Sequence, residues 1–147
     1  MARLIKFEIT TPEKKIYSED VEQITIPTQS GEITVLPGHI PLVAALKAGE
    51  LRVLKNKEEI IMAVSGGFIE VTPDKVVVLA DSAEHAADID EKRAEEARTR
   101  ASKLMTEKRF DAEEFALLSA KIEKEMARLH VVKKRKHRYT PGSTITQ

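Results

Sequence analysis

The stretch GEITVLPGHIPLVAALKAGELRV, Gly31 to Val53, decides the fold of the first half of this chain. Its centre is a Pro37-Gly38 pair, in which proline presets φ at the first central position of a turn and glycine accepts a positive φ at the second. Short apolar runs, residues 33–36 and 42–46, lie on either side, and Gly49 marks another turn. Short runs between tight turns predict β-strands here.

The same pattern extends outward over the first 80 or so residues. Ile5, Phe7 and Ile9 alternate with polar residues, and later runs rich in β-branched residues end at glycines and prolines. Many short strands with turn signals about every 8–12 residues favour a β-sandwich, so we expect two packed sheets. The Gly66-Gly67 pair is interpreted as a strand-to-strand turn or a bulge.

The second half has helical composition. No glycine occurs between Gly67 and Gly142, and alanine, glutamate, lysine and arginine dominate. Asp88 and Glu91 have capping-box spacing, which predicts a helix that begins near Ile89. A second helix is expected from about Asp111 to Val132.

The two helices are expected to pair through narrow stripes. The first would use small residues, and the second would turn one apolar face inward. Helices joined by a short loop usually lie antiparallel, and a hairpin with so little apolar surface should be marginal alone. The expected stripes are Ala94, Ala97, Ala101 and Leu104 on the first helix, and Phe115, Leu118, Ile122, Met126 and Leu129 on the second.

The chain is therefore predicted to be of the α+β class, with its β part first. We expect a β-sandwich over residues 1–85, a two-helix hairpin over 86–134 and a basic, disordered tail over 135–147. The zero net charge conceals an asymmetry, because residues 1–88 carry a net charge of −5 and residues 89–147 one of +5. Opposite charges favour contact between the two parts or a separate acidic partner.

Several classes of function are disfavoured. Cysteine is absent, so disulfides and cysteine-based metal sites are excluded, and the four histidines lack metal-ligand spacing. The chain begins without a signal pattern, and its longest apolar stretch is too short to cross a bilayer. No glycine-rich phosphate loop and no Ser–His–acid trio is recognisable, so no catalytic residue is expected.

A group of charged residues on the predicted hairpin points to an anion. Arg93 and Arg100 are seven residues apart, and Lys124 and Arg128 are four apart, so each pair shares a helix face. In an antiparallel hairpin these four cations can converge on one pocket that suits a polyphosphate. The alternative is that Asp90 and Arg93 only form an exposed ion pair in a first helical turn.

Two separated motifs resemble the epsilon subunit of the bacterial F-type ATP synthase. The first is the G-E-x-x-x-x-P-G-H-x-P-L run from Gly31, followed by G-x-L-R-V from Gly49. The second, I-D-x-x-R-A from Ile89 to Ala94, is similar to the ATP-binding motif of epsilon subunits from certain bacilli. Carried over by position, the resemblance implies an ATP site made of Glu84, Ile89, Asp90, Arg93, Arg100, Arg128 and Lys124, the last replacing an arginine of the family.

The resemblance also implies partners and a role. The sandwich would bind the gamma subunit and the c-ring, with Glu32 and His39 at that contact, although the position of His39 after Pro-Gly is most simply that of a turn residue. The chain would be a non-catalytic rotor subunit in the central stalk of a proton-translocating synthase, held peripherally at the cytoplasmic face of the bacterial membrane. Its hairpin would extend to the catalytic alpha and beta subunits and inhibit ATP hydrolysis.

ATP would act as a regulatory ligand that favours the folded hairpin, with no cofactor required and with Mg²⁺ dependence left open. Two other functions fit parts of the sequence. One is a free-standing ATP sensor, which would leave the Gly31 to Val53 segment without a role. The other is an adaptor that binds nucleic acid through the run KKRKHR, residues 133–138, whereas the resemblance implies no nucleic acid.

Overall fold

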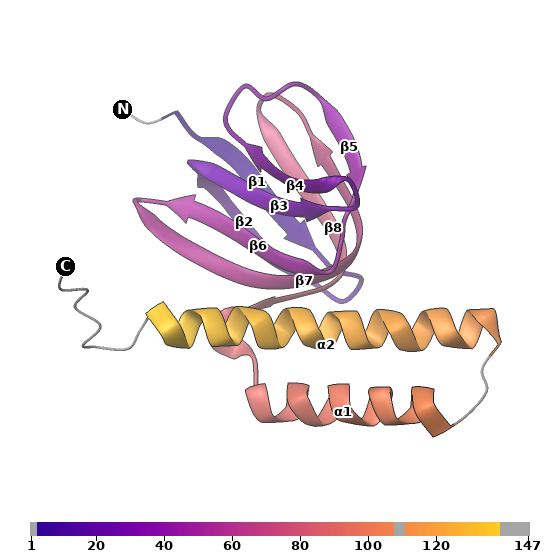
Figure 1. Ribbon diagram of the computed structural model, residues 1–147. Coiled ribbons are helices and arrows are strands. Elements are labelled where there is room, and N and C mark those ends of the chain that lie inside the picture. The colour runs from indigo at the N-terminus through magenta and orange to yellow at the C-terminus, as the bar shows by residue number, and fades with distance from the viewer. Residues whose placement is uncertain (1–2, 108–110, 139–147) are drawn as a thin grey trace.

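The computed structural model describes residues 3–107 and 111–138. Its strands form a sandwich that is followed by two long helices, which confirms the predicted β-then-α order (Figure 1). The elements are β1 (Ile5–Thr10), β2 (Lys15–Val21), β3 (Gln23–Thr28), β4 (Gly31–Val35), β5 (Leu42–Ala45), β6 (Gly49–Lys55), β7 (Glu58–Val71), β8 (Lys75–His85), the 3₁₀ turn η1 (Ala86–Asp88), α1 (Glu91–Glu107) and α2 (Ala112–Arg138).

The two layers of the sandwich belong to one hydrogen-bonded sheet. Its strand order is β2-β1-β8-β7-β6-β3-β4, and β5 pairs with the far end of β7. The first part of β7 pairs with β6 and its last part with β5, while β8 starts beside β1 and runs along most of β7. The expected pair of sheets is thus a single sheet whose two longest strands contribute to both layers.

Alternation along these strands creates the main core. Phe7, Leu51 and Met62 are fully buried between the layers, together with many isoleucines and valines. On β7 the neighbours of Met62, Ile61 and Ala63, point to the other face because successive side chains alternate. They form a second, smaller core beneath α2.

The Gly66-Gly67 pair lies inside β7 and is not a turn between two strands. Both residues have positive φ, 65° and 99°. The pairing with β8 keeps its register across them, from Ser65 opposite Ser82 to Gly67 opposite Ala80. A Cβ atom on Gly67 would lie 1.8 Å from the carbonyl oxygen of Leu79, so only glycine lets the two strands stay this close.

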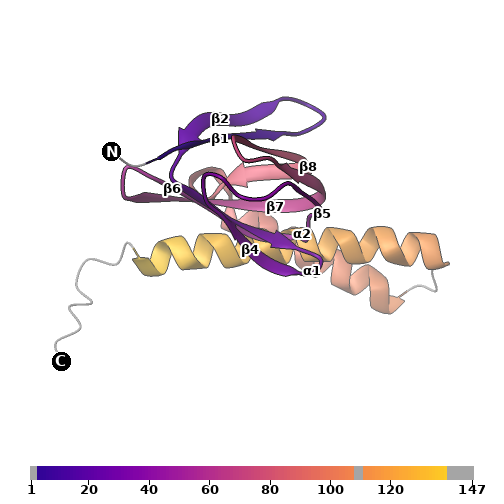
Figure 2. The ribbon, with the colours of Figure 1, turned by 90° about the horizontal axis from the view of Figure 1, so that it is seen from above.

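The hairpin lies along one side of the sandwich, with α2 between the sandwich and α1 (Figures 1 and 2). Ala94 and Ala101 of α1 are buried, as the small-residue stripe predicted, whereas Leu104 is exposed. The first half of α2 extends past the edge of the sandwich (Figure 1). Only the second half of α2 is therefore covered from both sides.

This position corrects the predicted inner face of α2. Of the five residues expected there, Leu129 is buried and Leu118 and Ile122 are half-buried, but Phe115 and Met126 are more than half exposed. The buried positions of α2 are instead Glu125, Ala127, Leu129, Val131 and Val132.

Both ends of the hairpin also differ from the prediction. Asp88 belongs to the 3₁₀ turn, so α1 begins later and Asp90 caps it, accepting a hydrogen bond from the Arg93 backbone N–H at 3.2 Å. The second helix continues to Arg138, so residues 135–138 are helical and not part of a disordered tail. Lys134 and Lys136 find acidic partners, and cations at a helix C-terminus favour its dipole. The rest of that tail, residues 139–147, lies outside the described residues.

Candidate functional site

Five of the seven residues predicted to bind ATP line one cleft of about 430 Å³. Three structural elements build it. Glu84 comes from the end of β8, Asp90 and α1 supply one wall, and α2 supplies the other. The five residues are Glu84, Asp90, Arg93, Arg100 and Arg128, joined in the lining by Asp88, Glu96 and Ala97.

Arg128 ties α2 to the sandwich at the base of this cleft. Its Nη1 donates to Glu125 Oε2 at 2.7 Å, and its Nη2 donates to Glu84 Oε1 at 3.3 Å. The buried Nε lies 2.7 Å from Glu84 Oε2 and forms an ion pair without the alignment of a hydrogen bond. Burial lowers the pKa of Arg128, but the two carboxylates outweigh it and leave that pKa above its ordinary value.

The predicted ATP-binding residues at the start of α1 and along it have different roles. Asp90 uses one carboxylate oxygen as the helix cap, and no ion pair joins it to Arg93 within the part of the chain that the structure describes. The side chains of Arg93 and Arg100 are exposed, and Arg100 makes only a long hydrogen bond, 3.4 Å, to the Glu96 carbonyl. These two arginines are the cations best placed to meet a ligand.

The structure separates two of the predicted residues from the cleft. Ile89 is buried in the small core with Ala86 and Val132, so its side chain supports η1 and α2. Lys124 lines a neighbouring cavity of about 570 Å³, which also contacts Glu84 and Asp88. Three of the four cations expected to converge therefore do so.

The sequence motif did not predict how many acidic residues line the cleft. Its lining includes three arginines but also four carboxylates, among them Asp88 and Glu96. Glu125, which holds Arg128, was missed too, although its i,i+3 spacing from Arg128 was a usable signal. Since Arg128 is already neutralised, a polyphosphate would depend on Arg93 and Arg100.

The predicted partner loop lies at the end of the sandwich away from the hairpin. His39 N–H donates to the Leu36 carbonyl at 3.1 Å, which closes the turn at Pro37 and Gly38. The His39 ring nitrogen Nδ1 lies 2.6 Å from the Ile40 carbonyl oxygen. Glu32 is on β4, where its carboxylate pairs with Arg52 at 2.9 Å, and so it does not share the environment of His39.

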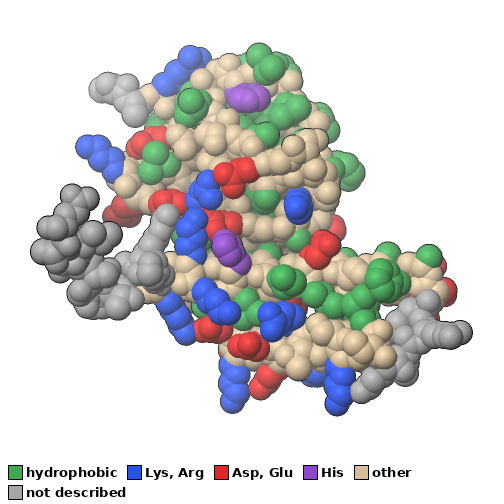
Figure 3. Space-filling model, in the orientation of Figure 1, with side chains coloured by type: hydrophobic (Ala, Val, Ile, Leu, Met, Phe, Trp, Pro, Cys, Tyr) green, Lys and Arg blue, Asp and Glu red, His purple; other side chains and the backbone are tan. Residues whose placement is uncertain are grey.

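Apolar side chains gather around this loop and on the strands beside it (Figure 3). Phe68 and Leu79 are directly opposite each other on β7 and β8, and both are more than half exposed. Val43 on β5 shares their face of the sheet. Exposed apolar patches of this kind mark contacts with other proteins.

Two lysines of the basic run at the end of α2 form ion pairs with acidic residues of the same chain. Lys134 pairs with Glu50 on β6, and Lys136 pairs with Glu91 at the start of α1. These contacts leave less free positive charge for nucleic acid than the sequence alone suggests. None of the described helices is long and apolar enough to cross a membrane.

Comparison with known proteins agrees with the two-part structure. Residues 4–86 match the family model for the ATP synthase delta/epsilon chain β-sandwich domain, and residues 87–133 match its long α-helix domain. A solved mitochondrial ATP synthase assembly from Euglena gracilis, containing OSCP, F1 and the c-ring, includes a chain that shares the fold, with a TM-score of 0.65 at 24% identity over 93% of this chain and 82% of that one.

Relatives of similar length give the same result. The ATP synthase epsilon chain of Dehalococcoides mccartyi is 46% identical over 92% of this chain and 96% of its own. That of Bacillus subtilis is 43% identical over 76% of this chain and 84% of its own. This chain therefore belongs to the ATP synthase delta/epsilon family, as one of its epsilon chains.

Proposed function

We propose that this chain is a rotor subunit in the central stalk of an F-type ATP synthase and performs no catalysis itself. The sandwich binds the gamma subunit and the c-ring, and the complex holds the chain at the cytoplasmic face of the bacterial membrane. The hairpin inhibits ATP hydrolysis when it leaves the sandwich and reaches the alpha and beta subunits. ATP, acting as a regulatory ligand, stabilises the docked hairpin.

The exposed apolar patch supports a role for the sandwich in binding partners. Val43, Phe68 and Leu79 present exposed apolar side chains on one face of β5, β7 and β8. An isolated monomer gains nothing from such a patch, whereas a protein partner would remove it from water. A partner can thus cover this surface while the hairpin stays docked on the sandwich.

The construction of the cleft carries the regulatory part of the proposal. Its walls come from β8, α1 and α2, so the complete cleft exists only while α2 is docked. A ligand that binds only this state shifts the equilibrium toward it. At about one hundred times its dissociation constant, such a ligand adds about 2.7 kcal/mol, which is about a hundredfold in population.

The direct test is calorimetric titration of the isolated chain with ATP. We expect saturable binding that Arg93→Gln or Arg100→Gln weakens at least tenfold, because a charge-assisted hydrogen bond to phosphate contributes about 1.5–3 kcal/mol. Lys92→Gln is the matched control, since Lys92 is exposed on α1 and does not line the cleft. Asp90→Asn adds a second test, because asparagine keeps the helix cap and removes the charge.

Absence of binding at several millimolar ATP would contradict the nucleotide part of the proposal. The inhibitory part is tested separately, by ATP hydrolysis in a reconstituted complex with the chain ended after Asp88. We expect a higher rate than with the full chain, and an unchanged rate would rule out an inhibitory hairpin. Co-elution with the gamma subunit distinguishes a stalk subunit from a free-standing ATP sensor.

A further inference from the structure

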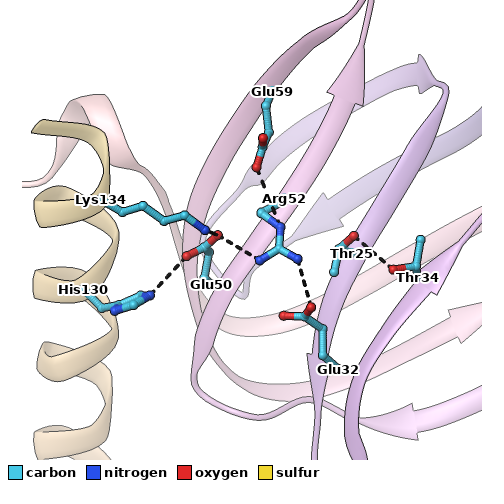
Figure 4. A network of polar contacts seen from close by, with 8 residues as sticks. All are labelled: Thr25, Glu32, Thr34, Glu50, Arg52, Glu59, His130 and Lys134. Atoms are coloured by element: carbon cyan, nitrogen blue, oxygen red, sulfur yellow. Dashed lines mark hydrogen bonds and ion pairs between the residues drawn. The ribbon is translucent and has the colours of Figure 1, made fainter. Parts of the chain in front are cut away.

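A buried carboxylate lies where α2 crosses the sandwich. Glu50 of β6 has a side chain that is only 7% exposed, and three basic side chains surround it (Figure 4). Lys134 Nζ donates to Glu50 Oε1 at 2.6 Å, and Arg52 Nη1 donates to the same oxygen at 3.1 Å. His130 Nε2 lies 3.2 Å from the other oxygen, Oε2.

The alternation of β6 explains this arrangement. Leu51 and Val53 face the main core, so Glu50 and Arg52 face outward, on the side that α2 covers. Burial raises the pKa of Glu50, but the hydrogen bonds from Lys134 and Arg52 outweigh it and leave the pKa below its ordinary value. The carboxylate is thus charged, and α2 supplies part of its compensation.

Arg52 connects this carboxylate to the exposed surface of the sandwich. Beyond Glu50, its guanidinium pairs with Glu32 Oε1 at 2.9 Å and lies 3.7 Å from Glu59 Oε1 (Figure 4). Lys134 and Arg52 therefore share one oxygen of Glu50, and the remaining charge of Arg52 is balanced by Glu32 and Glu59. Loss of the Glu32 charge would leave Arg52 more repulsive toward Lys134.

We propose that Glu50 and Lys134 form an ionic latch for the docked hairpin, and that Arg52 links the latch to Glu32. A basic side chain of a partner protein that neutralises Glu32 then loosens the hairpin. This link rests on the proposed function for the identity of that partner, whereas the latch itself belongs to the isolated chain. The latch holds α2 to β6, whereas Arg128 holds α2 to the end of β8, so hairpin docking responds to partner binding as well as to the nucleotide cleft.

The test measures hairpin docking in the isolated full chain without nucleotide. Because the chain has no cysteine, donor and acceptor dyes can be attached to cysteines introduced at two exposed positions, Asp20 on β2 and Glu113 on α2. Energy transfer is read at the temperature where half of the parent hairpins are undocked. Lys134→Gln is expected to lower the ratio of docked to undocked hairpins about tenfold, as loss of a charged hydrogen bond implies.

The control is Lys133→Gln, which makes the same charge change at an exposed residue with no ion pair to the described residues. Equal effects of the two variants would overturn the latch. Glu32→Gln is expected to lower the ratio about twofold, since Glu32 is exposed, and to have little effect once Lys134→Gln is present. Equal effects of Glu32→Gln in both backgrounds would overturn the link. Neither result depends on whether ATP binds or the complex is inhibited, which the titration and the hydrolysis assay decide.

Discussion

The sandwich and the hairpin are held by different kinds of interaction. The sandwich buries a continuous core of large apolar side chains between its layers, including Phe7, Leu51 and Met62. The hairpin buries mainly alanines and a few residues near the end of α2, and it is fastened by ion pairs at Arg128, Lys134 and Lys136. A large apolar core suits a permanent scaffold, because its side chains have no other place out of water. A small core suits an element that detaches, because its ion-paired groups can find other partners.

The largest loss of stability is expected when a large side chain in the sandwich core is replaced by a small one. Phe7→Ala removes a fully buried ring and should lower the free energy of unfolding by about 4 kcal/mol. Hydrogen exchange of the strand amides measures this loss in the sandwich itself. Val43→Ala, at a position that is 70% exposed, should change it by less than about 0.5 kcal/mol. Similar losses in both variants would contradict the assignment of the core.

An intermediate loss of stability is expected when an ion pair that holds the hairpin to the sandwich is removed. Arg128→Met leaves Glu84 and the buried Glu125 without their cation, which should weaken docking by about 2 kcal/mol while the strand amides stay protected. Hydrogen exchange of the β8 end and of α2, compared with that of the main core, separates the two regions. Arg98→Met on α1, outside the cleft lining, is the control. If the strands lost protection equally, the two regions would not be independent.

The smallest effect on stability is expected at Glu8, on the outward face of β1. Hydrogen bonds from Lys75 and Lys15 lower the pKa of Glu8 to about 2. Because this folded-state pKa lies below the unfolded value, the stabilisation is present above about pH 4.5 and is lost as pH falls toward 2. NMR titration should find this low pKa and a rise toward 4.5 in Lys75→Gln. An unchanged pKa in that variant would show that Lys75 is not its cause.

Local sequence pattern was sufficient where the physical signal was local. Strand alternation, the Pro37-Gly38 turn and the alanine spacing of α1 predicted the order of the elements and the antiparallel hairpin. Two cations one or two helical turns apart share a face whatever surrounds them, so the meeting of Arg93, Arg100 and Arg128 at one cleft followed from spacing together with the antiparallel arrangement.

What the sequence determined by itself is the class of fold and the residues that share a face, because both depend on periodicity along the chain. Only the tertiary structure decided which face of α2 is covered, since α2 lies between two neighbours whose extent no local pattern encodes. It also decided that Ile89 supports the small core, that Lys124 lies outside the cleft and that Lys134 reaches Glu50, 84 residues away in sequence. Contacts at that separation arise from the packing of whole elements, so the spacing of residues within one helix carries no trace of them.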